Sequence, residues 1–179
     1  MNNMNNMNNM NNMNNMNTQK GVGLIEVLVA LLLLAIGILG FVGLQLRAMD
    51  AANEATDRTI AINIARDLAE RMRVNKSALG EYKTAINAKT EKNGCIGSAA
   101  GYLPNCSSQV MAQFDASQIT QKATDLGHVV KINNCVGSSL NCIYVAWGDT
   151  NIDSNLDACI DASTGAYVAN SKCLVMEAF

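Results

Sequence analysis

An uninterrupted apolar run dominates the N-terminal third of the chain. Residues 27–44 read VLVALLLLAIGILGFVGL, a stretch of 18 residues without a charged or hydrogen-bonding side chain. A run of this length reaches the lower range for a membrane-spanning helix and is too long for the apolar core of a cleaved signal peptide. A buried helix of a soluble domain is the alternative, but helices in small domains rarely lack a polar face. The pattern therefore favours a membrane-spanning helix.

The helix is expected to continue well beyond the apolar run. Neither proline nor glycine occurs between Gly43 and Gly80, and apolar residues recur within 47–75 at spacings of three and four. That spacing predicts one apolar stripe along a helix. We expect a single helix over about residues 22–75, roughly 80 Å long at ~1.5 Å per residue, whose second half packs on another element. The stripe consists of Ala61, Ile64, Ala65, Leu68 and Met72.

Two pairs of opposite charges lie on the flanks of this stripe. Asp67 precedes Arg71 by four residues, and Glu70 precedes Arg73 by three, so each pair can meet on a helix surface. We interpret both pairs as part of a solvated helix face.

Three short segments in the last third of the chain are predicted strands. Residues 129–132, 142–147 and 172–176 are rich in β-branched and aromatic side chains, and Gly, Asn, Asp and Ser separate them. Residues 76–125 are interpreted as a loop with short helical pieces around 109–124. The predicted fold class is α+β, with a long N-terminal helix and a small antiparallel sheet packed on its C-terminal half.

All six cysteines lie in the polar region after the apolar run. An even number in such a region, behind a membrane segment, indicates disulfides formed in an oxidising compartment. A zinc site fits poorly, because the chain has no C-x-x-C pair and His128 is its only histidine. Many pairings are open, and we favour sequence neighbours because each bond would close a short loop. The favoured pairs are Cys95–Cys106, Cys135–Cys142 and Cys159–Cys173.

Charge and motifs argue against several functional classes. The formal net charge is −2, from 13 basic and 15 acidic side chains, so there is no overall basic field for nucleic acid. The sequence contains no phosphate-binding loop and no evident acid/base pair, and His128 lacks the companions of a catalytic histidine. We predict a protein that is not an enzyme and that needs no cofactor.

One segment offers a weak calcium hypothesis. Asp149, Asn151 and Asp153 place oxygen ligands at every second position, as at the start of an EF-hand loop. The glycine and the glutamate that complete such a loop are replaced by Ser154 and Ile160. A hydrated loop between strands is the alternative.

A single carboxylate stands at the start of the apolar run. Between Lys20 and Arg47 the only ionisable side chain is Glu26. A charge at the centre of a bilayer costs roughly 2.5–3.5 kcal/mol on insertion scales. Near the N-terminus of the helix the cost is lower, because the carboxylate lies by the interface and complements the helix dipole. Glu26 is therefore either a capping residue of the first turn or a residue with a function in the membrane.

The sequence around this glutamate resembles the type IV prepilin (class III) signal. The matching stretch is GVGLIEVL, from Gly21 to Leu28. In that family a membrane peptidase cuts after the glycine and methylates the new N-terminus. The resemblance implies cleavage between Gly21 and Val22, N-methylation of Val22, and a role for Glu26 in assembly, where it would attract the N-terminal amine of a neighbouring subunit.

This resemblance also implies a division of the chain. Residues 1–21, which begin with repeats of Met-Asn-Asn, would be a cleaved leader. Residues 22–46 would form the transmembrane half of the helix, which later lies in the filament core. Residues 47–179 would form a periplasmic globular domain.

Residues 24–75 further resemble the PilV family of minor type IV pilins, the type IV pilus modification proteins. The likeness rests on residues 35–45 and 65–75, and on Val145-Ala146-Trp147-Gly148-Asp149. It implies a minor pilin of the priming or tip complex, held by one span in the inner membrane and then located in the pilus. Implied partners are other minor pilins, the major pilin, the prepilin peptidase and a tip adhesin. A minor pseudopilin of type II secretion and a DNA-uptake pilin are the alternatives.

Overall fold

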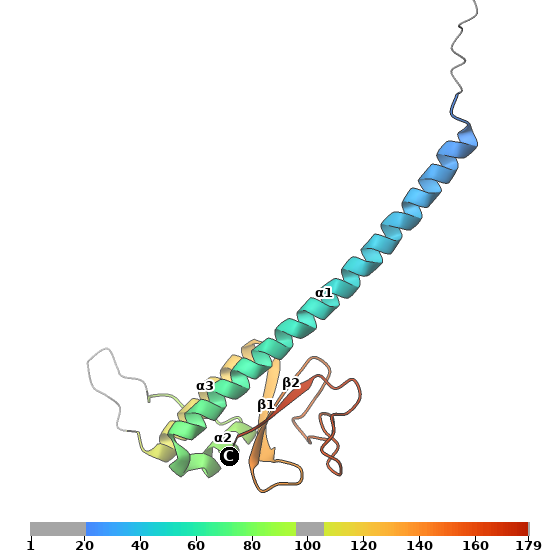
Figure 1. The fold of residues 1–179 in the computed structure, drawn as a ribbon. Helices are drawn as coiled ribbons and strands as arrows, with labels where there is room; N and C mark the ends of the chain where they lie inside the picture. Colours follow the sequence, from blue (N-terminus) through green and yellow to red (C-terminus); the bar gives the residue numbers. More distant parts are fainter. Residues whose placement is uncertain (1–20, 96–105, 179) are drawn as a thin grey trace, which may run out of the picture. The chain divides into compact units, whose positions relative to one another are not determined.

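The computed structural model describes residues 21–95 and 106–178, and the chain divides into two units, residues 1–49 and 50–179 (Figure 1). One helix, α1 (Leu24–Val74), contributes residues to both units, close to the expected range of 22–75. The second unit also contains η1 (Lys76–Ala78), α2 (Leu79–Asn87), α3 (Ser108–Asp125), β1 (His128–Asn134), β2 (Asn141–Trp147) and β3 (Cys173–Glu177).

In the first unit, the described part of α1 is exposed on all sides. Every residue from 24 to 49 is exposed, and Leu39, for example, keeps 72% of its surface. Among the described residues, α1 is the one helix long and apolar enough to cross a membrane. So large an apolar surface marks a segment that contacts lipid or other protein.

In the second unit, the predicted stripe of α1 is buried. Ala61, Ile64, Ala65, Leu68 and Met72 are each at most 1% exposed, which confirms the helical spacing read from the sequence. A fully buried side chain of this size stabilises a fold by roughly 1.5–3 kcal/mol. The stripe packs with α2, α3 and one face of the sheet, whose contributions are Val130, Ile132, Ile143, Val145 and Trp147.

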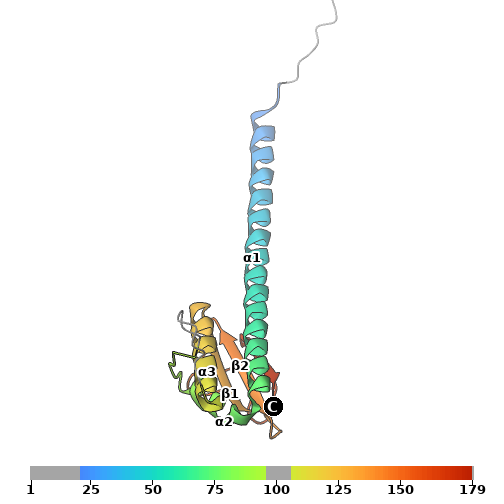
Figure 2. The ribbon, with the colours of Figure 1, turned by 90° about the vertical axis from the view of Figure 1, so that its left-hand side faces the viewer.

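The three strands form one antiparallel sheet in the order β1-β2-β3. The register places Lys131 beside Tyr144, and Tyr144 beside Val175. Helices α1, α2 and α3 cover one face, as Figure 2 shows for α1 and α3. The segment between β2 and β3 covers the other face and buries a second apolar cluster there, formed by Cys142, Tyr144, Ala146, Ile152, Cys159 and Ile160.

The expectation of a loop over residues 76–125 is wrong in part: α2 was not expected, whereas α3 covers the helical pieces expected around 109–124. Two α-helices occupy much of this region, and α3 alone has 18 residues. The side chain of Ser107 caps α3 by accepting a hydrogen bond from the Val110 N–H, at 3.4 Å. The stripe that α3 buries is made mostly of alanine, which gives a weak apolar signal: it contains Ala112, Ala116, Ile119 and Ala123.

One side chain pairs with the backbone in the middle of the outer edge of β1. The Asn87 side-chain amide donates to the Ile132 carbonyl oxygen at 2.7 Å and accepts from the Ile132 N–H at 3.0 Å. These two bonds are the ones that a neighbouring strand would make. Asn87 is the last residue of α2, so the end of that helix substitutes for a further strand.

Replacing this asparagine tests the arrangement. We expect Asn87→Ala to lower the free energy of unfolding by about 1–3 kcal/mol, because both backbone groups of Ile132 lose their partner. Urea unfolding of the detergent-solubilised chain, followed by circular dichroism, measures this. Thr84→Ala is the matched control, since its hydroxyl bonds only to the Gly80 carbonyl of the same helix, at 3.0 Å. Equal effects of the two substitutions would contradict the expectation.

Candidate processing and assembly site

The residues at the predicted cleavage point lie outside the helix. Gly21 to Gly23 have no regular secondary structure, and α1 begins at Leu24. The bond between Gly21 and Val22 is therefore in accessible, non-helical chain, and Val22 is 69% exposed. A peptidase needs such a segment, because backbone bonds within a helix are not free to enter an active site.

Glu26 lies in the first turn of α1. Its N–H donates to the Gly23 carbonyl oxygen at 2.9 Å, and the Val27 N–H reaches the same oxygen at 3.4 Å. A carboxylate in this position complements the free N–H groups and the positive end of the helix dipole. Its surroundings in the helix are apolar and exposed, including Leu24 at 81% and Ile25 at 71%. In lipid or in a protein core, this carboxylate would need a cation for compensation.

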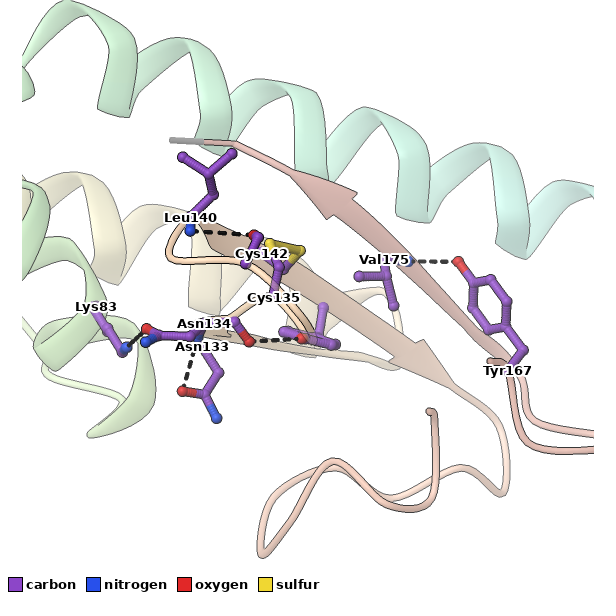
Figure 3. The surroundings of a disulfide bond; sticks show 10 residues. Lys83, Asn133, Asn134, Cys135, Leu140, Cys142, Tyr167 and Val175 are labelled. Carbon is purple, nitrogen blue, oxygen red and sulfur yellow. Dashed lines mark hydrogen bonds between the residues drawn. A yellow bond between two sulfur atoms is a disulfide. The ribbon is translucent and has the colours of Figure 1, made fainter. Parts of the chain in front are cut away.

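Three disulfides tie the second unit together. The Cα–Cα distances are 6.0, 5.0 and 5.8 Å, within the usual range. One bond closes the β1–β2 hairpin, as Figure 3 shows, and another joins the segment after β2 to the start of β3. Each stabilises a fold by about 2–4 kcal/mol, mainly by restricting the unfolded chain. The pairs are the sequence neighbours Cys95–Cys106, Cys135–Cys142 and Cys159–Cys173.

A polar cluster joins α1, α2 and α3. Arg71 donates from Nε to Asp67 at 2.9 Å and from Nη1 to Asp115 at 2.6 Å. The Tyr82 hydroxyl donates to the second oxygen of Asp115 at 2.5 Å. Burial and the neighbouring Asp115 carboxylate raise the pKa of Tyr82. The interpretation of Asp67 and Arg71 as a solvated face is therefore wrong, because Arg71 reaches across to a carboxylate that is only 9% exposed.

The other predicted ion pair stays on the surface. Arg73 bonds to Glu70 through an exposed contact on α1, as the sequence pattern indicates. The difference lies in direction around the helix, because Arg71 faces α3 and Arg73 does not.

The electrostatic balance of Asp67 makes the cluster sensitive to acid. Burial alone would raise the pKa of Asp67, but hydrogen bonds from Arg71 and Lys122 outweigh it and lower this pKa. The ionised carboxylate is therefore favoured by folding. Its contribution is complete above the pKa of the unfolded carboxyl, about 3.9, and is lost as the pH falls through the lower pKa of the folded state.

Removing one cation of this cluster should have an effect that depends on pH. We expect Lys122→Met to lower the free energy of unfolding by about 0.2–1 kcal/mol at pH 7, and by progressively less as the pH falls below about 3.9 and through the lower pKa of Asp67 in the folded state. Urea unfolding at several pH values measures the difference. The exposed Glu91→Gln is the control, and a Lys122→Met effect that stayed constant down to low pH would contradict this account.

The residues of the calcium hypothesis engage protein groups. Asp153 lies 2.8 Å from the Lys89 ammonium and 3.6 Å from that of Lys131, and these contacts lower the pKa of Asp153, chiefly through Lys89. Asn151 accepts a hydrogen bond from the Asp153 N–H at 2.8 Å. Asp153 also lines a groove of about 610 Å³ beside β1. A calcium ion that bound Asp153 together with Asp149 would have to displace two lysines.

His128 is held by backbone groups. Its ring is 2% exposed, with Nδ1 at 2.8 Å from the Leu126 carbonyl oxygen and Nε2 at 3.1 Å from that of Asp57. The neighbouring Trp147 donates from its indole nitrogen to Glu54 at 3.3 Å. Both contacts fix one end of the sheet to α1, which is a structural role that the sequence alone did not indicate.

A long apolar helix followed by a small disulfide-bonded α+β unit defines the class as pilin-like. Residues 43–117 match the family model described as Type IV pilin Tt1218, and residues 16–42 match the Prokaryotic N-terminal methylation motif. Over these residues the chain is similar to type IV pilins, the subunits of pili and of related pseudopili. No curated protein matches it, and neither does any solved structure.

Proposed function

We propose that this chain is a minor type IV pilin of the PilV kind, a structural subunit that takes part in pilus assembly within the priming or tip complex. The observation that carries the proposal is a single carboxylate, Glu26, in the first turn of a helix that is otherwise apolar from Leu24 to Leu44, a few residues after the exposed Gly21. An apolar helix with one carboxylate near its N-terminus suits a subunit that is first stored in a membrane and then added to a filament.

The compartment of each part follows from the same features. Residues 22–46 would span the inner membrane before assembly, and the globular domain of residues 47–179 would lie in the periplasm. The disulfides support this orientation, because such bonds persist in the periplasm and are rare in the cytosol. After assembly the chain would lie in the pilus, in contact with the major pilin, other minor pilins and a tip adhesin.

Cleavage is the first step to test. We expect prepilin peptidase to release residues 1–21, so that the mature chain begins with N-methylated Val22. Intact-mass measurement and N-terminal sequencing of protein from cells with and without the peptidase check this. A chain that still carries Gly21 in peptidase-positive cells would refute the proposal.

A pair of glycine substitutions makes the cleavage test specific. Gly21→Val should block processing, because a branched side chain would replace the glycine that the signal requires. Gly23→Ala should be processed, and it serves as the matched control. A Cβ atom meets nothing within 4 Å at Gly21 and only ordinary contact, 3.8 Å, at Gly23, so neither change disturbs the fold.

Assembly should depend on the charge of Glu26. We expect Glu26→Gln to be processed and inserted in the membrane but to enter sheared pili at about a tenth of the normal level or less, because a desolvated amine in the filament would lose its partner. Immunoblots of the sheared fibres and of the membrane fraction measure both quantities. Asp50→Asn removes a carboxylate from the same helix outside the apolar run and should leave assembly unchanged.

The same fractions separate the alternative functions. A wild-type chain found in pilus fibres supports the pilin proposal. A chain absent from fibres that instead co-purifies with a type II secretion machine would identify a pseudopilin. The net charge of −2 gives no support to a DNA-uptake pilin that binds nucleic acid directly.

A further inference from the structure

The outer edge of β3 keeps unpaired backbone groups. Lys172 and Ala178, at the two ends of the strand, bond to β2: the Lys172 carbonyl accepts from Trp147 at 3.0 Å, and the Ala178 N–H donates to Asn141 at 2.9 Å. Hydrogen bonds alternate along an antiparallel strand, so Cys173, Val175 and Glu177 turn their N–H and C=O groups away from β2. These groups form the free edge of the sheet.

One side chain touches this edge. The Tyr167 hydroxyl accepts a hydrogen bond from the Val175 N–H at 3.0 Å, as Figure 3 shows. Within residues 21–95 and 106–178, no other group bonds to the outward backbone atoms of β3. The opposite edge differs, because Asn87 satisfies both the N–H and the C=O of Ile132. Asn87 thus pairs with both backbone groups of one outward residue of β1, whereas Tyr167 covers only the donor of the central outward residue of β3.

The cover at Val175 is easy to remove. The Tyr167 side chain is 55% exposed, and its backbone is held by pairing with Ile160 and by the Val168 N–H bond to Cys159 at 3.0 Å, in a segment that the Cys159–Cys173 disulfide links to β3. The hydroxyl can therefore leave Val175 by rotation of one side chain, without unfolding of the segment that carries it.

We propose that the edge of β3 is a docking site for an extended strand of a partner protein, which adds to the sheet as a fourth, antiparallel strand. Only an extended backbone offers donors and acceptors at the spacing that Cys173, Val175 and Glu177 present. Residues directly opposite each other share a face of the sheet, so the partner places an apolar side chain beside Val175 and a cation beside the exposed Glu177. Until a partner strand binds, the Tyr167 hydroxyl accepts the hydrogen bond of the Val175 N–H.

This proposal is independent of the pilin assignment, because it uses only residues of the globular unit. If cleavage at Gly21 or assembly through Glu26 fails, the strand-docking proposal is unaffected. If strand docking fails, the proposed cleavage and assembly are likewise unaffected.

A designed peptide tests the site on the full-length, disulfide-bonded chain in detergent. The probe is fluorescein-labelled Thr-Lys-Thr-Val-Thr-Val-Thr, which puts valine opposite Val175 and lysine opposite Glu177. We expect saturable binding by fluorescence anisotropy, together with slower hydrogen exchange of the β3 amides. The same peptide with a fully N-methylated backbone should not bind, since it offers no donors. Equal binding of both peptides, or no protection of β3, would overturn the proposal.

Variants of the chain give effects of opposite sign. Tyr167→Phe should bind the peptide about 2- to 10-fold more tightly, because the competing hydroxyl is gone. If the Tyr167 hydroxyl only stabilises the fold, its removal should not tighten peptide binding.

Val175→Pro should abolish peptide binding, since it removes the outward N–H while the bonds of β3 to β2 remain. Circular dichroism and disulfide mapping check the fold of Val175→Pro. If this variant does not fold, the N-methylated peptide tests whether binding requires backbone hydrogen bonds.

Charge exchange tests the chemistry assigned to the partner. A peptide with glutamate in place of lysine should bind about 1.5- to 5-fold more weakly to the wild-type chain, and Glu177→Lys should reverse the preference. The absence of such a reversal would refute the antiparallel register. Protection of β3 that rises with protein concentration without any peptide would identify a second copy of this chain as the occupant, and would overturn the choice of a foreign strand.

Discussion

Burial of the apolar stripe on the second half of α1 organises the unit formed by residues 50–179. An isolated helix gains little stability in water, so most of the stability of a protein helix comes from packing of its apolar face. Here α2, α3 and the sheet all contribute to one cluster around Leu68 and Met72. The first half of α1 carries no such stripe, because it is apolar on every side. One helix therefore carries two kinds of surface, and the change falls where charged side chains begin, near Arg47.

Polar contacts then fix the orientation of elements that apolar packing alone would leave adjustable. Arg71 and Tyr82 converge on Asp115, so α1, α2 and α3 share one carboxylate. At one end of the sheet, Trp147 bonds to Glu54 of the same long helix. Apolar burial is not directional, whereas each of these bonds requires one geometry. The cluster and the tryptophan contact thus set the angle at which the helices cover the sheet.

The long helix, its buried stripe and the three strands follow from the sequence because each produces a periodic signal. The helix has no breaker between Gly43 and Gly80, and β2 reads as a run of apolar residues. The same run reflects burial on both faces of β2, in which six of the seven residues are buried. Helix α3 coincides with the helical pieces expected around residues 109–124, but its full length was not predicted, because alanine supplies three of its buried residues. The roles of Asn87 and Asp115 depend on partners distant along the chain, and no local pattern reports those.

At the amino end, the sequence alone identified the candidate site. Gly21, Val22 and Glu26 form a motif within a few residues, so spacing is enough to recognise it. The edge of β3 could not be recognised in this way, because whether a strand is central or lateral depends on the whole sheet. No local sequence pattern predicts that the Tyr167 hydroxyl accepts a hydrogen bond from the Val175 N–H.

The disulfide between Cys159 and Cys173 has a consequence for where the protein can mature. It links the segment that covers the second face of the sheet to the first residue of β3. In a reducing compartment this covering segment keeps its apolar cluster and the contacts of Asp153 with two lysines, but it loses its covalent link to β3. Oxidation ties the segment and the strand to each other. The stability of this side of the sheet therefore depends on the redox state of the surroundings.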